Sequence, residues 1–493
     1  MRPIVLIHGY SAESTETDSK SIEGIYGTMP DDLRTIYGPD QVVEIDLSRW
    51  ISLEDGLTID DIARGLQRAL QADEYKDLLV DGFDVIIHST GALVIRNWFK
   101  KFSPRPSPLG NLIYLAGANL GSGWAHIGKG QLAKWGRFIF QGGAERGVQV
   151  LDALEFGSEE ALDLHLFFLD PEHSLDQVYQ VREHVVIGSQ ADVKWFEMPI
   201  RYAKEDGSDG VIRAAAGNLN FIYCHLTPTE EAEQLDWETV AEEETMHLSR
   251  TGERKEFYRV TTLSVPGGDG RAELPFAIPY ECAHTGDEMG IVIGSKCRQQ
   301  VLKLINLALL SDGSNWPGRV GLFQQETDST YEQVKTKKKP AKWPWSTDPR
   351  TQYDPHAQVI FRLRDQDGRP IRHYDIFFDS HVGQVKGATP IGSLIEDKHV
   401  NQQSSNCICF YLRVAAFDKK LKQWVNKLDQ VGDIHLEISA TEPETDLITY
   451  LPFRHEIPAA KLKEWIRPHT TTIFDIQLLR LPGPKVFMIT RNE

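Results

Sequence analysis

Residues 84–92 read Asp-Val-Ile-Ile-His-Ser-Thr-Gly-Ala, and the interpretation of the whole fold starts from them. Residues 84–87 are typical of a buried strand, and residues 93–102 carry apolar side chains at helical spacing. Ser89 therefore falls in a tight strand-to-helix turn, which needs small neighbours for clearance. Gly91 supplies one of them, whereas the second position, usually glycine, is Ile87. We expect the Ser89 hydroxyl to be raised clear of the sheet.

The first 312 residues continue this alternation of strands and helices. A further amphipathic helix is expected at residues 59–70. Apolar runs typical of buried parallel strands lie at 4–7, 42–45, 112–115 and 185–188. Strands that alternate with helices indicate a mostly parallel sheet covered on both faces. The fold class is therefore α/β, and residues 1–312 are predicted to be a catalytic domain of the α/β-hydrolase type, ending in a helix at about 291–310.

A segment at about 120–170 differs from its surroundings. Glycine-rich stretches flank residues 132–140, which are apolar and aromatic with two cations. This pattern fits a lid or a surface that meets lipid, and it fits equally well a helix packed on the sheet.

Residues 313–352 are predicted to be a linker because proline, charge and turn residues are dense there. Within it, residues 335–345 mix lysine with tryptophan. Such a mixture can anchor on an anionic membrane, but a solvated linker is the simpler interpretation.

From residue 353 onward the pattern changes to a period of two. A turn at 365–368 is expected to join the first two strands as a hairpin. Strands are predicted at 358–364, 373–378, 407–414, 435–439, 474–479 and 486–490. Residues 353–493 therefore read as an all-β, sandwich-like domain.

Composition narrows the class of protein. The formal net charge is −18, which argues against nucleic acid as a partner because phosphate binding needs a dominant basic surface. Five cysteines without metal or disulfide spacing indicate reduced thiols, and we expect no metal and no cofactor. We expect no signal peptide, because the first apolar run spans four residues, and no transmembrane helix, because no window approaches 18 uninterrupted apolar residues. The protein is therefore expected to be cytoplasmic or peripheral to a membrane, with signal-less export left open.

Acyl transfer by a serine needs an acid and a base, which follow the serine in chain order in this fold. Asp209 lies in a Gly-Ser-Asp-Gly turn and is our choice for the acid, with Asp206 as the alternative. His284, in an Ala-His-Thr-Gly loop before the final helix, is our choice for the base. The alternatives His225 and His247 lie in segments typical of strand or helix.

The oxyanion formed in such a reaction needs backbone N–H donors. In this fold one donor comes from the loop after the first strand and one from the residue after the nucleophile. We therefore assign the main-chain N–H groups of Tyr10 and Thr90. His8 and His88 are interpreted as structural, and Arg213 as a member of a structural ion pair.

Four blocks together resemble the PlaB-type bacterial phospholipase A and lysophospholipase family. They are residues 8–11 (His-Gly-Tyr-Ser), 88–91 (His-Ser-Thr-Gly), 208–213 (Ser-Asp-Gly-Val-Ile-Arg) and 284–286 (His-Thr-Gly), followed by a β-rich C-terminal part. The family's elbow begins with Thr where this chain has Ile87, a change that touches no catalytic group.

The resemblance implies hydrolysis of phospholipid and lysophospholipid acyl esters by a membrane-associated, self-associating enzyme. By the same resemblance, Ser89 is expected to be the nucleophile, Asp209 the acid and His284 the base. Two other interpretations stay open: a catalytically weak scaffold that binds a membrane or a partner, and an acyltransferase or amidase that uses the same three residues.

Overall fold

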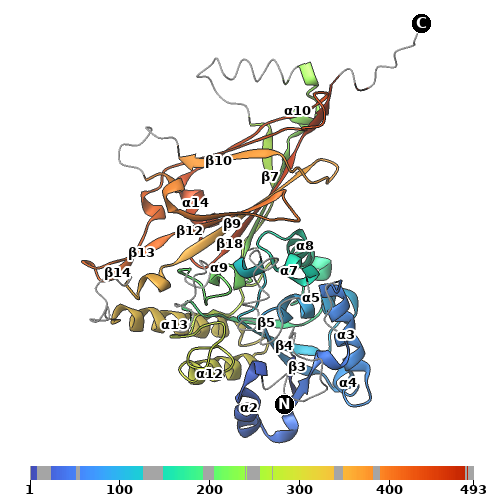
Figure 1. The fold of residues 1–493 in the computed structure, drawn as a ribbon, viewed down its shortest axis with the longest axis vertical. Helices are drawn as coiled ribbons and strands as arrows, with labels where there is room; N and C mark the ends of the chain where they lie inside the picture. The colour runs from blue at the N-terminus through green and yellow to red at the C-terminus, as the bar shows by residue number, and fades with distance from the viewer. Residues whose placement is uncertain are drawn as a thin grey trace. The chain divides into compact units, whose positions relative to one another are not determined.

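The computed structural model describes residues 2–7, 24–51, 56–125, 148–191, 205–238, 240, 256–268, 270–337, 348–380, 389–483 and 486. The chain forms two compact units (Figure 1). Unit 1 comprises Met1–Asn220, Pro266–His356 and Ala416–Val425, and unit 2 comprises Phe221–Val265, Ala357–Ala415 and Asn426–Glu493.

Unit 1 is built on a six-stranded sheet in which all neighbouring strands are parallel. The strand order is β2-β1-β3-β4-β5-β8. The bounds are Ile4–Ile7 for β1, Val42–Ile45 for β2, Phe83–His88 for β3, Leu109–Leu115 for β4, Arg182–Val186 for β5 and Phe276–Ala277 for β8. The predicted parallel sheet and the α/β-hydrolase fold class are therefore confirmed. Ser89 directly follows β3, which is an internal strand of this sheet.

Helices accompany these strands in the order expected of an α/β fold. Helix α3 starts with a capping box between Thr58 and Asp61, and α5 is buried along nine of its eleven residues. The helix bounds in unit 1 are α2 Met29–Tyr37, α3 Ile59–Gln71, α4 Leu78–Asp81, α5 Gly91–Lys101, α7 Val148–Leu154, α8 Glu159–Phe167, α9 Ala214–Gly217, α12 Arg298–Leu309 and α13 Trp316–Lys335. Helix α5 is therefore buried on nearly every side, and it begins at Gly91, two residues after Ser89.

The lid-like segment at 120–170 is only partly within the described residues. Residues 132–140, which carried that prediction, lie outside them. The described part forms α7 and α8, and α8 packs against α5 through Phe167, whose ring lies 4.9 Å from Lys100 Nζ.

The predictions for the last helix of the catalytic domain and for the linker after it differ from the structure. The last predicted helix begins at Arg298, because residues 291–297 are turns. Half of the predicted linker, residues 316–335, is the 20-residue helix α13, which buries Phe323, Thr327 and Val334 along one face. Two buried threonines, at 327 and 330, interrupt the apolar stripe of this face, so the sequence looked like a solvated connection.

Unit 2 contains a six-stranded mixed sheet and a three-stranded antiparallel sheet. The strand orders are β11-β12-β9-β18-β6-β7 and β10-β15-β17. The strands are β6 Ile222–Pro228, β7 Tyr258–Ser264, β9 His356–Asp365, β10 Tyr374–Ser380, β11 Ile395–Val400, β12 Cys407–Arg413, β15 Ile434–Ala440, β16 Ile448–Tyr450, β17 Phe453–Ile457, β18 Thr471–Leu478 and β19 Arg480–Pro482, with helices α10 Glu230–Glu233 and α14 Ala459–Trp465. The two-stranded sheet of β13 Ala415–Asp418 and β14 Gln423–Asn426 belongs mainly to unit 1. One apolar cluster is shared by both larger sheets, with Phe361 and Phe474 from one and Leu436 and Phe453 from the other. This is the sandwich-like arrangement predicted for the C-terminal part.

The C-terminal unit draws on more of the chain than residues 353–493. Strand β6, from the middle of the sequence, pairs in parallel with β18, and β7 pairs with β6. A parallel partner far away in the chain leaves no local signature, so sequence patterns did not reveal it.

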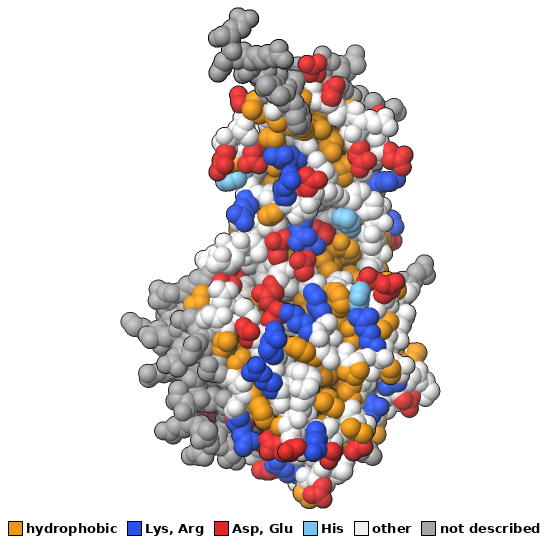
Figure 2. Space-filling model, turned by 90° about the vertical axis from the view of Figure 1, so that its right-hand side faces the viewer, with side chains coloured by type: hydrophobic (Ala, Val, Ile, Leu, Met, Phe, Trp, Pro, Cys, Tyr) orange, Lys and Arg blue, Asp and Glu red, His pale blue; other side chains and the backbone are white. Residues whose placement is uncertain are grey.

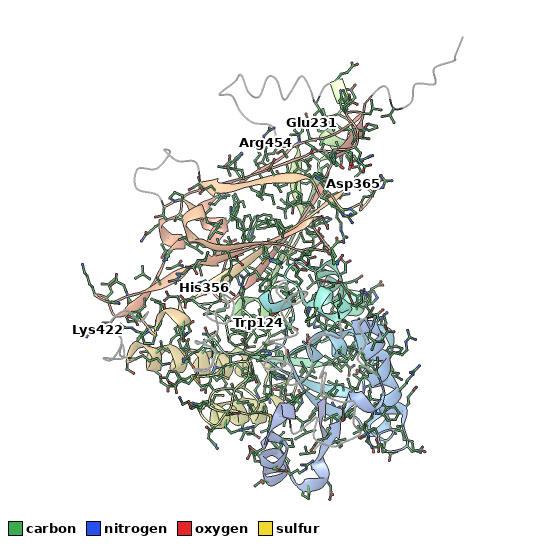
Figure 3. All side chains as sticks on the ribbon, viewed as in Figure 1. Trp124, Glu231, His356, Asp365, Lys422 and Arg454 are labelled. Atoms are coloured by element: carbon green, nitrogen blue, oxygen red, sulfur yellow. The ribbon has the colours of Figure 1, made fainter. Side chains whose placement is uncertain are left out.

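The turn at 365–368 exists but does not close a hairpin between β9 and β10. Asp365 (labelled in Figure 3) accepts the Gly368 N–H, and Gly368 has a φ of 80°. Strand β9 pairs with β18, whereas β10 pairs with β15 in the other sheet. The turn therefore carries the chain from one sheet to the other. Of the predicted strand 486–490, only Val486 is described, and it is not in a strand.

Three further properties bear on the expectations from composition. All five cysteines are free and buried. Among the described residues, no helix combines the length and the apolar character that a bilayer crossing requires. Acidic and basic side chains are interspersed over the face drawn in Figure 2, so this face does not carry a single sign of charge.

Candidate active site

Ser89 occupies a strained turn between β3 and α5. Its φ is 52°, in the left-handed region that non-glycine residues rarely adopt, at a cost of roughly 1–2 kcal/mol. The Ser89 N–H donates to the Leu115 carbonyl at 3.3 Å, and the Ser89 carbonyl accepts the Ala118 N–H at 3.1 Å. The turn is thus pinned to the residues at the end of β4, and a strained serine held in this way is the expected geometry of a nucleophile elbow.

The imidazole of His284 connects Ser89 to Asp209. The Ser89 Oγ lies 3.1 Å from His284 Nε2, and His284 Nδ1 lies 3.0 Å from Asp209 Oδ2. The side chains of Asp209 and His284 are 0% and 2% exposed, which shields the contact between them from water. The structure thus brings together the three residues chosen from the sequence, in an order that allows a proton to pass from the hydroxyl to the imidazole.

The turn around Asp209 explains how a buried carboxylate is accommodated. Its Oδ1 accepts the N–H groups of Val211 at 2.9 Å and Ile212 at 2.7 Å. This leaves Oδ2 for the imidazole, and the Asp209 carbonyl also accepts the His284 N–H at 2.9 Å. Of the two acids considered from the sequence, Asp209 is the one that makes these contacts.

Two side chains from the segment after β4 hold the acid turn, and no motif in the sequence marks either of them. Ser122 Oγ donates to the Val211 carbonyl at 2.7 Å, and Trp124 Nε1 donates to the Gly210 carbonyl at 2.6 Å. Trp124, labelled in Figure 3, is 2% exposed. These bonds satisfy the carbonyls of the two residues that follow Asp209, so other segments of the chain hold the turn in addition to its own hydrogen bonds.

Arg213 ends the same turn and forms the predicted ion pair. Its Nε and Nη2 donate to the two carboxylate oxygens of Glu205 at 2.9 and 2.8 Å. Its guanidinium carbon lies 4.1 Å from the centroid of the Phe156 ring. This two-pronged, stacked arrangement is one that lysine cannot reproduce.

His88, interpreted as structural, contacts the candidate base directly. The two imidazole rings are 4.7 Å apart, and His88 Nε2 lies 3.3 Å from the His284 carbonyl. Burial, and secondarily the neighbouring His284, lowers the pKa of His88 well below its usual 6.5. His88 is therefore neutral at ordinary pH, and its Nε2 must carry the proton because a carbonyl can only accept.

The oxyanion donors are partly within the described residues. Thr90 is 2% exposed and directly precedes α5, so its N–H lies at the positive end of that helix. Tyr10, the other predicted donor, and His8 lie outside the described residues.

The alternative bases can also be located. His225 lies on β6, as its sequence pattern predicted, and its Nδ1 is 3.4 Å from Thr261 Oγ1. His247 lies outside the described residues. Within the described part of the chain, no group of three or more His, Cys, Asp or Glu side chains is arranged to hold a metal ion.

Comparison with known proteins supports the fold assignment. No family model matches the chain, and no curated protein sequence matches it either. Among solved structures, phospholipase PlaB from Legionella pneumophila superposes with a TM-score of 0.77 at 22% identity, covering 100% of this chain and 96% of that one. PlaB in complex with thio-NAD gives a TM-score of 0.76 at 22% identity, covering 100% and 97%. Over its whole length, this chain therefore has the same fold as PlaB, in agreement with the resemblance seen in its sequence.

Proposed function

We propose that the protein is a serine hydrolase of carboxylic esters, with Ser89 as nucleophile, His284 as general base and Asp209 as the acid that orients it. The observation that carries the proposal is the pair of contacts at 3.1 and 3.0 Å that joins these residues through one imidazole. A serine hydroxyl becomes a useful nucleophile when a base of this kind is within hydrogen-bonding distance. The strained φ of Ser89 adds support, since strain of this kind is concentrated at functional sites.

The proposed reaction follows from these positions. Ser89 Oγ attacks the acyl carbonyl while His284 Nε2 takes its proton, and Asp209 stabilises the imidazolium that results. The main-chain N–H groups of Thr90 and Tyr10 donate to the oxyanion, each worth about 3–4 kcal/mol of barrier. His284 then returns the proton to the leaving alkoxide, and water attacks the acyl-enzyme to release the carboxylic acid.

For the substrate we propose the acyl esters of phospholipids and lysophospholipids. The support is the fold shared over the whole chain with a protein known as a phospholipase. Because such substrates reside in bilayers and micelles, we also propose peripheral membrane contact. Self-association, implied by the same resemblance, stays a prediction that light scattering of the purified protein can test.

A fluorophosphonate probe tests the nucleophile. The wild-type protein should be labelled, and Ser89→Ala should not. Equal labelling of both proteins would show that the nucleophile is elsewhere.

Incubation with mixed phospholipid and lysophospholipid vesicles, followed by mass spectrometry, tests the substrate. We expect free fatty acid and the deacylated lipid. A labelled but lipid-inactive protein would retain the serine hydrolase and reject the phospholipase. Transfer of the acyl chain to an added alcohol, with no free fatty acid, would identify an acyltransferase.

A further inference from the structure

Two adjacent residues between α13 and β9 contact both loops of the candidate site. The Gln352 carbonyl accepts the Gly207 N–H at 2.8 Å, two residues before Asp209. The Tyr353 hydroxyl accepts the Glu281 N–H at 3.1 Å, three residues before His284. One short segment, the 3-10 turn Thr351–Tyr353, thus contacts both the acid turn and the base loop, each a few residues before its catalytic side chain.

The Tyr353 hydroxyl can link Glu281 to Gln190 only while it keeps its proton, and its surroundings keep it neutral. Because a backbone N–H can only donate, the hydroxyl proton must go to its other neighbour, Gln190 Oε1, at 2.8 Å. Tyr353 is 0% exposed, and burial raises its pKa well above the usual 10. The hydroxyl therefore bridges Gln190 and Glu281 throughout the working pH range.

Lys337, two residues after α13, contacts the same two residues as the Tyr353 hydroxyl, Gln190 and Glu281. Its Nζ donates to Gln190 Oε1 at 2.7 Å and lies 3.5 Å from Glu281 Oε1. It also lies 4.8 Å from the ring of Tyr280 and 5.1 Å from the ring of Tyr353, within the range of cation–π attraction. One cation thus joins four groups on three separate segments of unit 1.

Glu281 itself shows why the base loop needs support. Its φ is 50°, an unfavourable value for a residue with a side chain, so this conformation persists only where neighbours enforce it. Tyr353 binds its N–H and Lys337 attracts its carboxylate. From Glu281 the chain runs through the fully buried Cys282 to His284, so a shift at Glu281 is passed to the imidazole.

We propose that Gln352, Tyr353 and Lys337 are positioning residues that fix the separation of the acid turn from the base loop, so that the segment after α13 is part of the catalytic apparatus. The inference rests on the proposed function, because it names what keeps His284 within reach of Ser89. None of these residues touches the reacting atoms. They act through Gly207 and Glu281, and a displacement of about 1 Å at a catalytic group can cost about 100-fold in rate.

The test measures kcat and KM on a soluble p-nitrophenyl ester, together with melting temperature. Tyr353→Phe keeps the ring and removes the hydroxyl, and Lys337→Met is a second variant that removes the cation. We expect each to lower kcat about 10-fold or more while KM changes less than about twofold. Tyr37→Phe is the matched control, because its hydroxyl donates to Asn306 Oδ1 at 2.7 Å elsewhere in unit 1. It should keep wild-type kcat.

Combination with His284→Ala separates positioning from general destabilisation. If Tyr353 acts through His284, adding Tyr353→Phe to His284→Ala should not lower the residual rate further. A further tenfold loss in the double variant, or wild-type kcat in both Tyr353→Phe and Lys337→Met, would overturn the inference. Full activity of His284→Ala would instead reject the proposed function itself.

Discussion

The Oγ of Ser89 lies 3.1 Å from Nε2 of His284, although 195 residues separate them in the chain. The parallel sheet makes this meeting possible, because the carboxyl ends of its strands present their loops at one edge. Ser89 follows β3, and the loop of His284 follows β8, so the two side chains approach from different strands of one sheet.

Substitution of Ser89 should separate activity from stability. Ser89→Ala and Ser89→Gly should both abolish ester hydrolysis and probe labelling. Because Ser89 has a φ of 52°, glycine relieves a strain that alanine keeps, so Ser89→Gly should be more stable than Ser89→Ala by about 1 kcal/mol. Urea unfolding of both variants measures the difference. A clear advantage for alanine would mean that the turn is not strained.

Asp209→Asn should keep the turn and lose the chemistry. The amide oxygen can still accept the N–H groups of Val211 and Ile212, whereas the amide nitrogen favours the wrong tautomer of His284. We expect kcat to fall about 10³- to 10⁴-fold, KM to stay nearly constant and the melting temperature to change little. Asp206→Asn is the control and should stay close to wild type. A large fall in kcat for Asp206→Asn, with little change for Asp209→Asn, would mean that Asp206 is the acid.

Buried histidines should make the fold sensitive to acid. Burial lowers the pKa of His184 to about 3 and those of His88 and His165 well below 6.5. Below pH 6.5 the unfolded chain binds these protons and the folded chain does not. The free energy of unfolding should therefore fall as pH falls, by about 1.4 kcal/mol per pH unit for each histidine, until its folded pKa is reached.

His184→Gln isolates one of these contributions. Its amide can still bond to Ser311 Oγ, which lies 2.8 Å from His184 Nε2, but glutamine does not titrate. Between pH 6 and 4 the free energy of unfolding of the variant should fall less steeply with pH than that of wild type. The difference in slope should correspond to about one proton fewer taken up on unfolding. Denaturant titrations at several pH values measure both slopes. Parallel slopes would mean that His184 is protonated in the folded protein.

Gly188→Ala should disturb the base loop at Cys282. A Cβ at Gly188 would lie 2.0 Å from the Cys282 carbonyl oxygen, and backbone cannot move aside cheaply. We expect a loss of about 3 kcal/mol or more in stability and a large fall in kcat. Gly321→Ala is the matched control, since a Cβ there meets nothing within 4 Å and α13 should gain about 0.5–1 kcal/mol. Differential scanning calorimetry and ester hydrolysis report both effects.

The sequence could predict features that depend on local pattern. The strand before Ser89, the helix after it and the turns around Asp209 and His284 each have a signature within about ten residues, and the structure has all of them. The chain order of serine, acid and base then linked these three turns into one hypothesis.

Other features depend on partners that a local pattern does not reveal. Nothing near Gln352 or Tyr353 indicates that they contact residues 207 and 281. Helix α13 was missed because threonines occupy part of its buried face, although Phe323, Thr327, Thr330 and Val334 have helical spacing. The pairing of β6 with β18 is parallel and distant, so neither strand carries a mark of the other.

The pairing of β6 with β18 also has a consequence during synthesis. Tyr223 on β6 donates to Asp475 on β18, and 252 residues separate them. At about 5–20 residues per second, a ribosome needs about 12–50 s to complete that distance, during which β6 has no permanent neighbour on that side. Nascent chains should therefore depend on chaperones during this interval, and expression at low temperature should lengthen it.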